Sequence, residues 1–193
     1  MKVSLRELRG NWQSGYALDK HTVSSAFVGY NEWGRPQYNT VRTDVGEAVY
    51  QMKYRSDWSM VTPLARTLAA HVYPKFENVG FLVPMPASTQ RARQPVTEVT
   101  QALAKLVRLP MFDAMLTKQR GGQSLKNLNT RDEKVAALVG AFQVADVIGE
   151  NGRWNALLVD DLFHTGATAE AACTALSGYA KVAKVYLATL TWR

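Results

Sequence analysis

The sequence predicts an α/β fold in which a mostly parallel sheet is covered by helices on both faces. Short apolar runs of strand length alternate with segments of helical periodicity through most of the chain. With 193 residues, 47% of them hydrophobic, the chain is long enough to bury one substantial core. Two adjacent carboxylates and a small-residue loop follow one apolar run, and open α/β sheets bind ligands at such places.

Residues 1–45 differ from the rest of the chain and are expected to form an N-terminal extension, or hood, before an α/β domain over residues 46–193. The run TVSSAFVGYN, residues 22–31, is typical of a strand, and GRPQYN is typical of a turn that leads into a second extended piece. Aromatic side chains are frequent in this region: Trp12, Tyr16, Phe27, Tyr30, Trp33 and Tyr38.

A helix is predicted after this region, because apolar residues recur at helical spacing at Val61, Leu64, Ala65, Leu68 and Val72. Thr62 is its expected N-cap, with Pro63 at the first helical position. The run GFLVPMP, residues 80–86, predicts a short buried strand ended by prolines. A further helix, which stops before Pro110, is predicted from Val96, Val99, Leu103, Leu106 and Val107.

The second half of the chain continues the alternation after a polar, glycine-containing loop, QRGGQSLKNLNTRDEK, at residues 119–134. Long loops of this kind inside a domain are usually functional or disordered. AFQVADVI predicts an extended segment, RWNALLVDD a buried strand and KVAKVYLATL a final strand. Between the last two, one apolar helix face is predicted from Ala169, Ala172, Cys173, Leu176 and Ala180.

The composition limits which classes of partner and which cellular compartment are expected. A formal net charge of +7 favours anionic partners, either phosphorylated small molecules or nucleic acid. The single cysteine, Cys173, excludes an internal disulfide and a cysteine-rich zinc module, and it suits a reducing compartment. We find neither a signal-peptide pattern at the start nor an apolar run long enough to span a membrane. A cytoplasmic protein is therefore expected.

The acidic pair Asp160–Asp161 and the loop after it predict a ligand site. The pair follows the apolar run ALLV, and the loop FHTGAT leads into the helix expected near Ala169. A helix N-terminus presents free N–H groups to phosphate. Gly166 permits close approach of the backbone to an anion, while Thr165 and Thr168 supply hydroxyl donors. A ligand with a phosphate at one end and a diol or Mg²⁺ at the other would fit both parts.

Three other interpretations compete with this one. A single Asp at a strand end commonly caps a turn, although the paired carboxylates followed by HTGAT favour a ligand site. An ATPase of the Walker type would need the pattern G-x-x-x-x-G-K-[ST], which the sequence lacks. A receiver-type acidic pocket would need several further strand and helix units after the acidic pair, and the chain ends too soon for them.

The run VDDLFHTGAT, residues 159–168, resembles the ribose-phosphate signature of the type I phosphoribosyltransferases. The likeness extends to the ComF-like branch of that family over roughly residues 44–193. The stretches that carry it, in order, are AVYQMKYRSDWSMVTPLARTLA, FLVPMPASTQRARQP, QRGGQSLKNLNTRDEK and AFQV. The signature is fairly specific, whereas the other stretches carry weight mainly through their order.

The resemblance implies a Mg²⁺-dependent phosphoribosyltransferase that uses phosphoribosyl pyrophosphate (PRPP) and a nucleobase or related acceptor. It assigns Asp160 and Asp161 as catalytic residues at the ribose hydroxyls, directly or near Mg²⁺. It implies 5′-phosphate binding by His164, Thr165, Gly166, Ala167 and Thr168. Pyrophosphate would be bound by Met85, Pro86, Ala87 and Ser88. A flexible loop would close with Lys118, Arg120, Lys126 and Arg131.

The chain departs from the family pattern in two respects. His164 stands where the signature usually has a threonine, so it either donates to phosphate or points outward. The four-cysteine zinc module that often precedes ComF-like domains is absent, so residues 1–45 have another role, and their aromatic residues either stack on a base or simply pack. An alternative function is a regulatory, non-catalytic PRPP-binding protein associated with DNA uptake and natural transformation.

Other residues have competing roles. Arg91 and Arg93, beyond the pyrophosphate loop, are candidates for phosphate or DNA contacts, and His21 and His71 are expected to be ordinary packed or surface residues. The segment KYRSDW, residues 53–58, predicts a helix end and turn. The oligomeric state stays open, with a homodimer common among such proteins.

Overall fold

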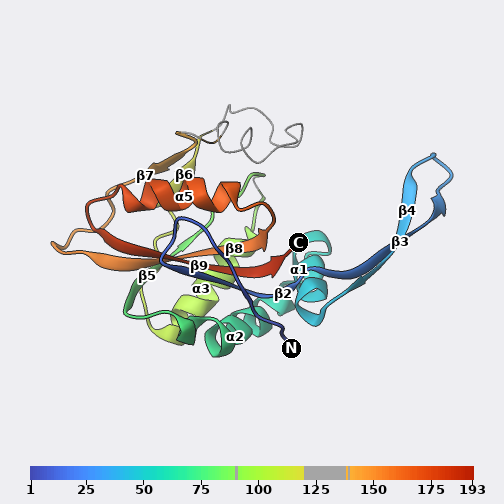
Figure 1. Cartoon of the computed structure of the whole chain (residues 1–193), viewed down its shortest axis with the longest axis horizontal. Coiled ribbons are helices and arrows are strands. Elements are labelled where there is room, and N and C mark those ends of the chain that lie inside the picture. Colours follow the sequence, from blue (N-terminus) through green and yellow to red (C-terminus); the bar gives the residue numbers. More distant parts are fainter. Residues whose placement is uncertain (90, 120–137, 139) are drawn as a thin grey trace.

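The computed structural model describes residues 1–89, 91–119, 138 and 140–193, and its centre is a five-stranded sheet (Figure 1). The strand order is β1-β2-β9-β8-β5. Only β1 runs antiparallel to its neighbour; the other three pairs are parallel. The strands are β1 (Arg6–Glu7), β2 (Ser14–Lys20), β5 (Val79–Pro84), β8 (Trp154–Phe163) and β9 (Val182–Trp192). The mostly parallel sheet predicted from the sequence is confirmed.

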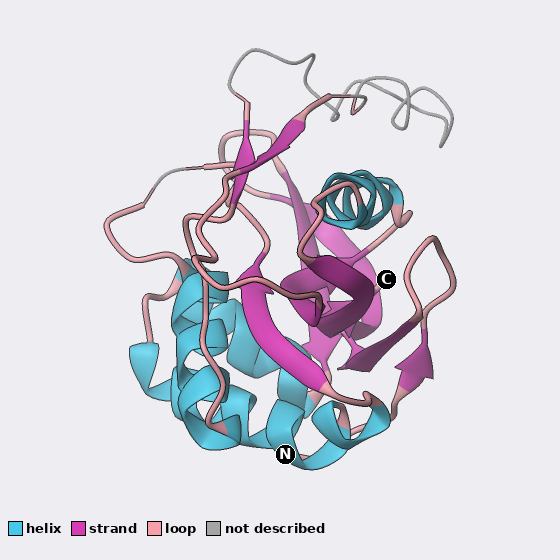
Figure 2. Ribbon diagram, turned by 90° about the vertical axis from the view of Figure 1, so that its left-hand side faces the viewer, coloured by secondary structure: helices cyan, strands magenta, loops and turns pink. Residues whose placement is uncertain are grey.

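Helices cover both faces of this sheet (Figures 1 and 2). They are α1 (Asp44–Tyr54), α2 (Val61–His71), α3 (Pro95–Val107) and α5 (Ala167–Ser177). Alternation along β8 sends Leu157 and Val159 into the core shared with α1, α2 and α3, whereas Ala156 and Leu158 enter the core shared with α5. Because the strand is buried on both sides, its sequence is a continuous apolar run.

The start of α2 differs from the sequence prediction. A 3₁₀ turn, Trp58–Met60, leads directly into the helix at Val61, so Thr62 lies inside the helix and does not cap it. Asp57 takes the capping role instead, because its Oδ1 accepts hydrogen bonds from the backbone N and the hydroxyl of Ser59. A second 3₁₀ turn, Tyr73–Lys75, follows α2.

The N-terminal region is divided between the sheet and a projecting hairpin. Residues 6–20 supply β1 and β2, whereas β3 (Thr22–Tyr30) and β4 (Pro36–Arg42) pair only with each other. Figure 1 shows this hairpin extending away from the rest of the molecule. The two extended pieces predicted here are confirmed. Within the expected extension of residues 1–45, the part that stands apart from the sheet is the hairpin.

A second two-stranded antiparallel sheet, β6 (Leu116–Lys118) with β7 (Phe142–Val144), lies on the α5 side of the central sheet. Phe142 and Leu116 belong to the buried core on that side. In the part of the chain that the structure describes, no helix is both long enough and apolar enough to cross a membrane.

Candidate functional site

The two predicted carboxylates lie within β8, close to its carboxyl end. Successive side chains of a strand point to opposite faces, so Asp161 faces the side of α1 while Asp160 faces the opposite side. The backbone N of Asp161 also donates a hydrogen bond of 2.8 Å to Oδ1 of Asp160. The adjacent acids therefore meet different surroundings, which reduces the repulsion that their sequence positions suggest.

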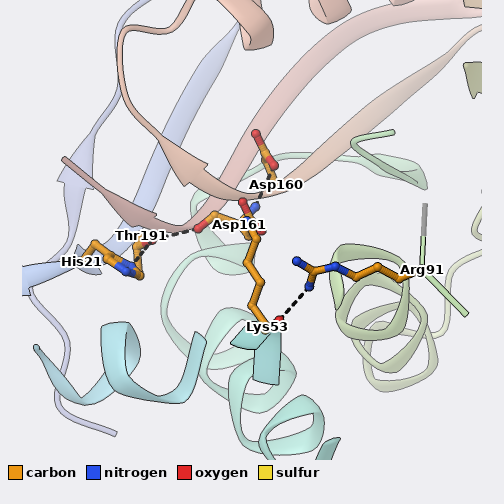
Figure 3. Close-up of polar contacts among 6 residues, drawn as sticks. All are labelled: His21, Lys53, Arg91, Asp160, Asp161 and Thr191. Atoms are coloured by element: carbon orange, nitrogen blue, oxygen red, sulfur yellow. Dashed lines mark hydrogen bonds and ion pairs between the residues drawn. The ribbon is translucent and has the colours of Figure 1, made fainter. Parts of the chain in front are cut away.

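Asp161 is paired with a lysine that the sequence interpretation did not select. Nζ of Lys53, in the last turn of α1, lies 2.5 Å from Oδ2 of Asp161 (Figure 3). Both side chains are shielded, with 29% of Lys53 and 13% of Asp161 exposed. Burial opposes the charged form of Lys53, but the Asp161 carboxylate outweighs it, and the pKa of Lys53 is raised. Lys53 is therefore held as a cation beside Asp161.

Asp160, in contrast to Lys53, is shifted toward its uncharged form. Burial, and then the charge of Asp161, raise the pKa of Asp160 from 3.8 to about 7, although Lys53 and Lys118 offset part of the rise. Lys118, at the end of β6, is half-buried, and burial lowers its pKa while Asp160 opposes that change. The ligand-free site thus holds one carboxylate in an ion pair, Asp161, and one, Asp160, that takes up a proton near neutral pH.

The backbone of Asp161 is also fixed from the other side. Its carbonyl accepts a hydrogen bond of 2.8 Å from the hydroxyl of Thr191 on β9. Because that hydroxyl donates to Asp161, its oxygen is left to accept from Nδ1 of His21, 3.2 Å away (Figure 3). Burial, with Arg193 and Arg42, lowers the pKa of His21, which favours a neutral ring carrying its proton on Nδ1. His21 is thus a packed residue that supports the site.

A cavity of about 280 Å³ opens beside the acidic pair. Its lining includes both carboxylates, the four residues of the predicted pyrophosphate loop and Thr168 of the predicted phosphate loop. Lys53 and Arg91 also line it. The four loop residues are Met85, Pro86, Ala87 and Ser88. One space is thus bordered by three parts of the chain that are far apart in the sequence: Lys53, the segment that begins at Met85, and the segment from Asp160 to Thr168. The space has room for a small polar ligand.

The predicted phosphate-binding segment, residues 164–168, runs into α5, and Gly166 caps that helix with a φ of 84°. A Cβ at this position would lie 3.0 Å from Cζ of Phe163, so conformation and space both favour glycine. The helix begins at Ala167, two residues earlier than expected. His164 and Thr165 are exposed and, like Gly166 and Ala167, are not among the residues that line the cavity.

Of the predicted flexible-loop cations, only Lys118 belongs to the part of the chain that the structure describes. Its Nζ lies 5.7 Å from the centroid of the Phe142 ring. Arg120, Lys126 and Arg131 lie outside the described residues.

The two arginines beyond the pyrophosphate loop have different surroundings. Nη1 of Arg91 donates a hydrogen bond of 2.7 Å to the carbonyl of Lys53, at the edge of the cavity. Arg93 instead pairs with Glu98, with 2.6 Å between Nη2 and Oε2, and lies 4.3 Å from the centroid of the Trp58 ring. Arg91 therefore belongs to the site, whereas Arg93 stabilises the start of α3.

The sequence did contain a signal for Lys53. Val45, Val49 and Lys53 are spaced four residues apart, and both valines are buried. A lysine that continues a buried helical stripe needs a partner for its charge. The interpretation of KYRSDW as a helix end and turn was right about the backbone but did not consider that partner.

No protein-family model matches the sequence, and no curated protein matches it in sequence. The fold, however, is similar to that of an adenine phosphoribosyltransferase from Trypanosoma brucei, whose structure holds AMP, pyrophosphate and ribose-5-phosphate. The TM-score is 0.51 at 11% sequence identity, over 100% of this chain and 87% of that one. At this identity the likeness concerns the fold alone.

Two other solved structures are more distant. A Leishmania donovani UMP synthase gives a TM-score of 0.44 at 13% identity, over 88% of this chain and 29% of that one. A Staphylococcus aureus hypoxanthine phosphoribosyltransferase gives 0.42 at 16% identity, over 69% of this chain and 63% of that one. The chain therefore spans less than two thirds of either protein. Its fold is the α/β fold of type I phosphoribosyltransferases.

Proposed function

We propose that this protein is a Mg²⁺-dependent phosphoribosyltransferase that transfers the ribosyl phosphate of PRPP to a nitrogenous base. One observation carries the proposal. The acidic pair Asp160–Asp161, the loop Met85–Ser88 and Thr168 near the N-terminus of α5 line a single cavity. A sugar that carries a phosphate at one end and a pyrophosphate at the other needs a site with these three parts.

The reaction would form a bond between a base nitrogen and the anomeric carbon while the bond from that carbon to the pyrophosphate oxygen breaks. Positive charge develops on the ribose and negative charge on the departing pyrophosphate. Asp160 and Asp161 are suited to the ribose side, and the cations Lys53 and Arg91, which also line the cavity, are suited to the leaving group. The bond electrons leave with pyrophosphate, and the base releases its proton to solvent or to a nearby acceptor.

The donor set fits a magnesium ion that arrives with the substrate. Among the described residues there is no group of three or more His, Cys, Asp or Glu side chains that could hold a metal ion. Mg²⁺ commonly takes only one or two protein carboxylates together with substrate phosphates, and Asp160 and Asp161 can supply them. When bound, the ion would neutralise charge on the pyrophosphate.

Ligand binding would also rearrange the Lys53–Asp161 ion pair. In the ligand-free protein Lys53 neutralises Asp161, so ribose hydroxyls or a cation must compete with it for the same carboxylate. Lys53 borders the cavity together with the pyrophosphate loop. If Lys53 moved from the Asp161 carboxylate to the pyrophosphate, the ligand would take its place at Asp161. The carboxylate and the pyrophosphate would then both have partners. The lysine would then hold the empty site together and bind the leaving group in the filled one.

The test is calorimetric titration of PRPP with Mg²⁺ into the wild type and into an Asp160→Asn/Asp161→Asn variant. We expect binding by the wild type and loss of binding in the folded variant. Asp113→Asn/Glu150→Gln is the matched control, because it removes two exposed acids and changes the formal charge by the same amount. Equal binding by all three proteins would refute the assigned site.

Transfer is measured separately, as pyrophosphate release with a panel of nucleobases. Release that depends on one base would establish the enzyme and its acceptor. PRPP binding without release for any base would instead favour the regulatory, ComF-like alternative. If PRPP does not bind, a fluorescent oligonucleotide titrated at low and raised salt tests the DNA partner, because real phosphate contacts weaken steeply with salt.

A further inference from the structure

The projecting hairpin, which we call the arm (residues 22–42), supplies none of the residues that line the cavity. Its strands β3 and β4 pair only with each other, and nearly every residue of β3 is exposed. A two-stranded ribbon is at best marginally stable in water and gains stability when further strands or another surface cover it. The arm is therefore expected to pack against another surface.

One face of the arm is aromatic. Phe27 lies directly opposite Tyr38, and an irregularity in the register between Phe27 and Gly29 brings Tyr30 to the same side. The Phe27 ring centroid lies 5.2 Å from that of Tyr30 and 5.8 Å from that of Tyr38. These side chains are nonetheless 52%, 70% and 57% exposed. They form a contiguous apolar surface that the molecule itself leaves open.

The tip of the arm has a defined turn. Oδ1 of Asn31 accepts hydrogen bonds from the backbone N of Trp33 and of Arg35, and Gly34 takes the positive φ that the turn requires. Trp33, at this tip, is 74% exposed. A turn fixed in this way presents its tryptophan without the disorder that would weaken binding.

The base of the arm is fixed as well. The hydroxyl of Thr43 donates to the carbonyl of Lys20, which joins the two ends of the hairpin. Arg42 pairs with Glu47 and stacks 3.8 Å from the centroid of the Tyr50 ring. The arm is thus held at one end against α1 while the rest of it projects.

Charge argues against a nucleic-acid partner for the arm. Its charged residues are Glu32, Arg35 and Arg42, and Arg42 is already paired. Phosphate contacts need several free cations, and the excess positive charge of the chain lies almost entirely outside the arm. Two bodies with the same positive charge repel each other, so a nearly neutral arm that projects from the body is a suitable place for two copies to meet.

The available area also suits a second copy. Aromatic side chains bury about 150–250 Å² each, so the four of the arm, at their observed exposures, offer roughly 500 Å². With neighbouring aliphatic atoms, this approaches the roughly 600 Å² per partner at the lower end of standard interfaces. Two arms related by a two-fold axis present the same aromatic face to each other, so the contact is self-complementary.

The geometry points to a homodimer in which the aromatic face of the arm packs against the same face of a second copy. This inference does not depend on the proposed reaction. It assigns Phe27, Tyr30 and Tyr38 to the contact centre and Trp33 to its periphery. The four strands of the paired arms would then share the apolar layer that each ribbon lacks alone.

Sedimentation velocity over a range of protein concentrations tests the dimer. We expect the wild type to sediment as a dimer. Phe27→Ser/Tyr38→Ser should weaken dimerisation by at least about a hundredfold, because each substitution removes an aromatic side chain from both copies at the contact. The control is Leu106→Ser, which removes an exposed apolar side chain from α3 (46% exposed) and should leave the dimer intact. A monomeric wild type at every concentration, or a double variant that still dimerises, would overturn the inference.

Hydrogen exchange of the unmodified protein provides a test that does not depend on how the variants fold. The backbone amides of Gln37–Val41 should exchange more slowly as protein concentration rises, while amides of the central sheet stay unchanged. Exchange of those amides that does not vary with concentration, in a sample that sediments as a dimer, would place the contact elsewhere and refute the role of the arm.

Discussion

Lys53 and Asp161 are separated by 108 positions in the sequence, yet 2.5 Å separates Nζ of one from Oδ2 of the other. The pair joins the end of α1 to the carboxyl end of β8, at the edge of the cavity. It neutralises one of two adjacent carboxylates, and Lys53 also offsets part of the pKa rise that burial and Asp161 impose on the other, Asp160. A residue outside the signature thus takes part in setting the charge of the site, together with burial and the acidic pair itself.

Substitution of Lys53 by Met should destabilise the protein and weaken PRPP binding. Loss of the ammonium leaves the shielded Asp161 carboxylate unpaired, which should lower the free energy of unfolding by about 1–3 kcal/mol, less than for a fully buried pair because both side chains are partly exposed. Chemical denaturation measures the first effect, and calorimetry with PRPP and Mg²⁺ measures the second, for which we expect a loss of about tenfold.

Lys75→Met is the control for this prediction, because Lys75 is an exposed lysine in the 3₁₀ turn after α2. It should change neither quantity by more than about 0.5 kcal/mol. Equal effects of the two substitutions would show that only net charge matters and that the ion pair has no specific role.

The stability of the wild type should fall as pH rises between about 4 and 7, relative to Asp160→Asn. The pKa of Asp160 is raised from 3.8 to about 7 in the folded state, so over this window the folded protein holds a proton that the unfolded chain has lost. The contribution of that proton to stability decreases by up to about 1.4 kcal/mol per pH unit and is gone above the folded pKa. Asn does not titrate, so the variant lacks this slope.

Urea denaturation of both proteins across this pH range measures the difference in unfolding free energy. The unfolding free energy of the variant should rise relative to that of the wild type up to about pH 7. Above that pH the difference between the two should stay constant. Asp113→Asn, at an exposed position, should follow the wild type. A difference between wild type and Asp160→Asn that does not vary with pH would contradict the raised pKa.

Binding of PRPP with Mg²⁺ should release a proton from Asp160 at pH values below about 7. A cation, or hydroxyls that donate to the carboxylate, favours its ionised form, so the affinity should rise with pH until Asp160 is ionised in the free protein. Calorimetry in buffers with different ionisation enthalpies counts the released protons. The release should disappear well above pH 7, and a count that stays the same above and below would point to another group, such as the ligand phosphates.

Gly166→Ala should destabilise the protein by about 1–3 kcal/mol and weaken PRPP binding. Gly166 lies at the start of α5 with a φ of 84°, which is unfavourable for alanine. The added Cβ would also lie 3.0 Å from the ring of Phe163. Thermal unfolding and calorimetry measure the two effects. Gly149→Ala is the control, because a Cβ added there would meet nothing within 4 Å and the φ of Gly149 is not positive; it should be neutral or slightly stabilising.

Much of the fold could be predicted because local patterns report it directly. The run ALLV marked β8 because a strand buried on both faces must be apolar throughout, and the helical spacing from Val61 to Val72 marked α2. The exact start of α2 was not predictable, because it depends on a preceding 3₁₀ turn capped by Asp57. The hairpin strands were predicted from their composition, but the sequence did not distinguish an aromatic face that is covered from one that is exposed.

For the candidate site, the sequence by itself determined which chemical groups are available: an adjacent acidic pair, a glycine at the start of a helix and a proline-bordered loop. These groups are local, so their spacing along the chain is enough to recognise them. Only the tertiary structure decided that Lys53 neutralises Asp161, that burial raises the pKa of Asp160 and that Arg91 reaches the carbonyl of Lys53. Such pairings depend on how distant elements pack, and electrostatic energies depend on burial and distance rather than on sequence separation.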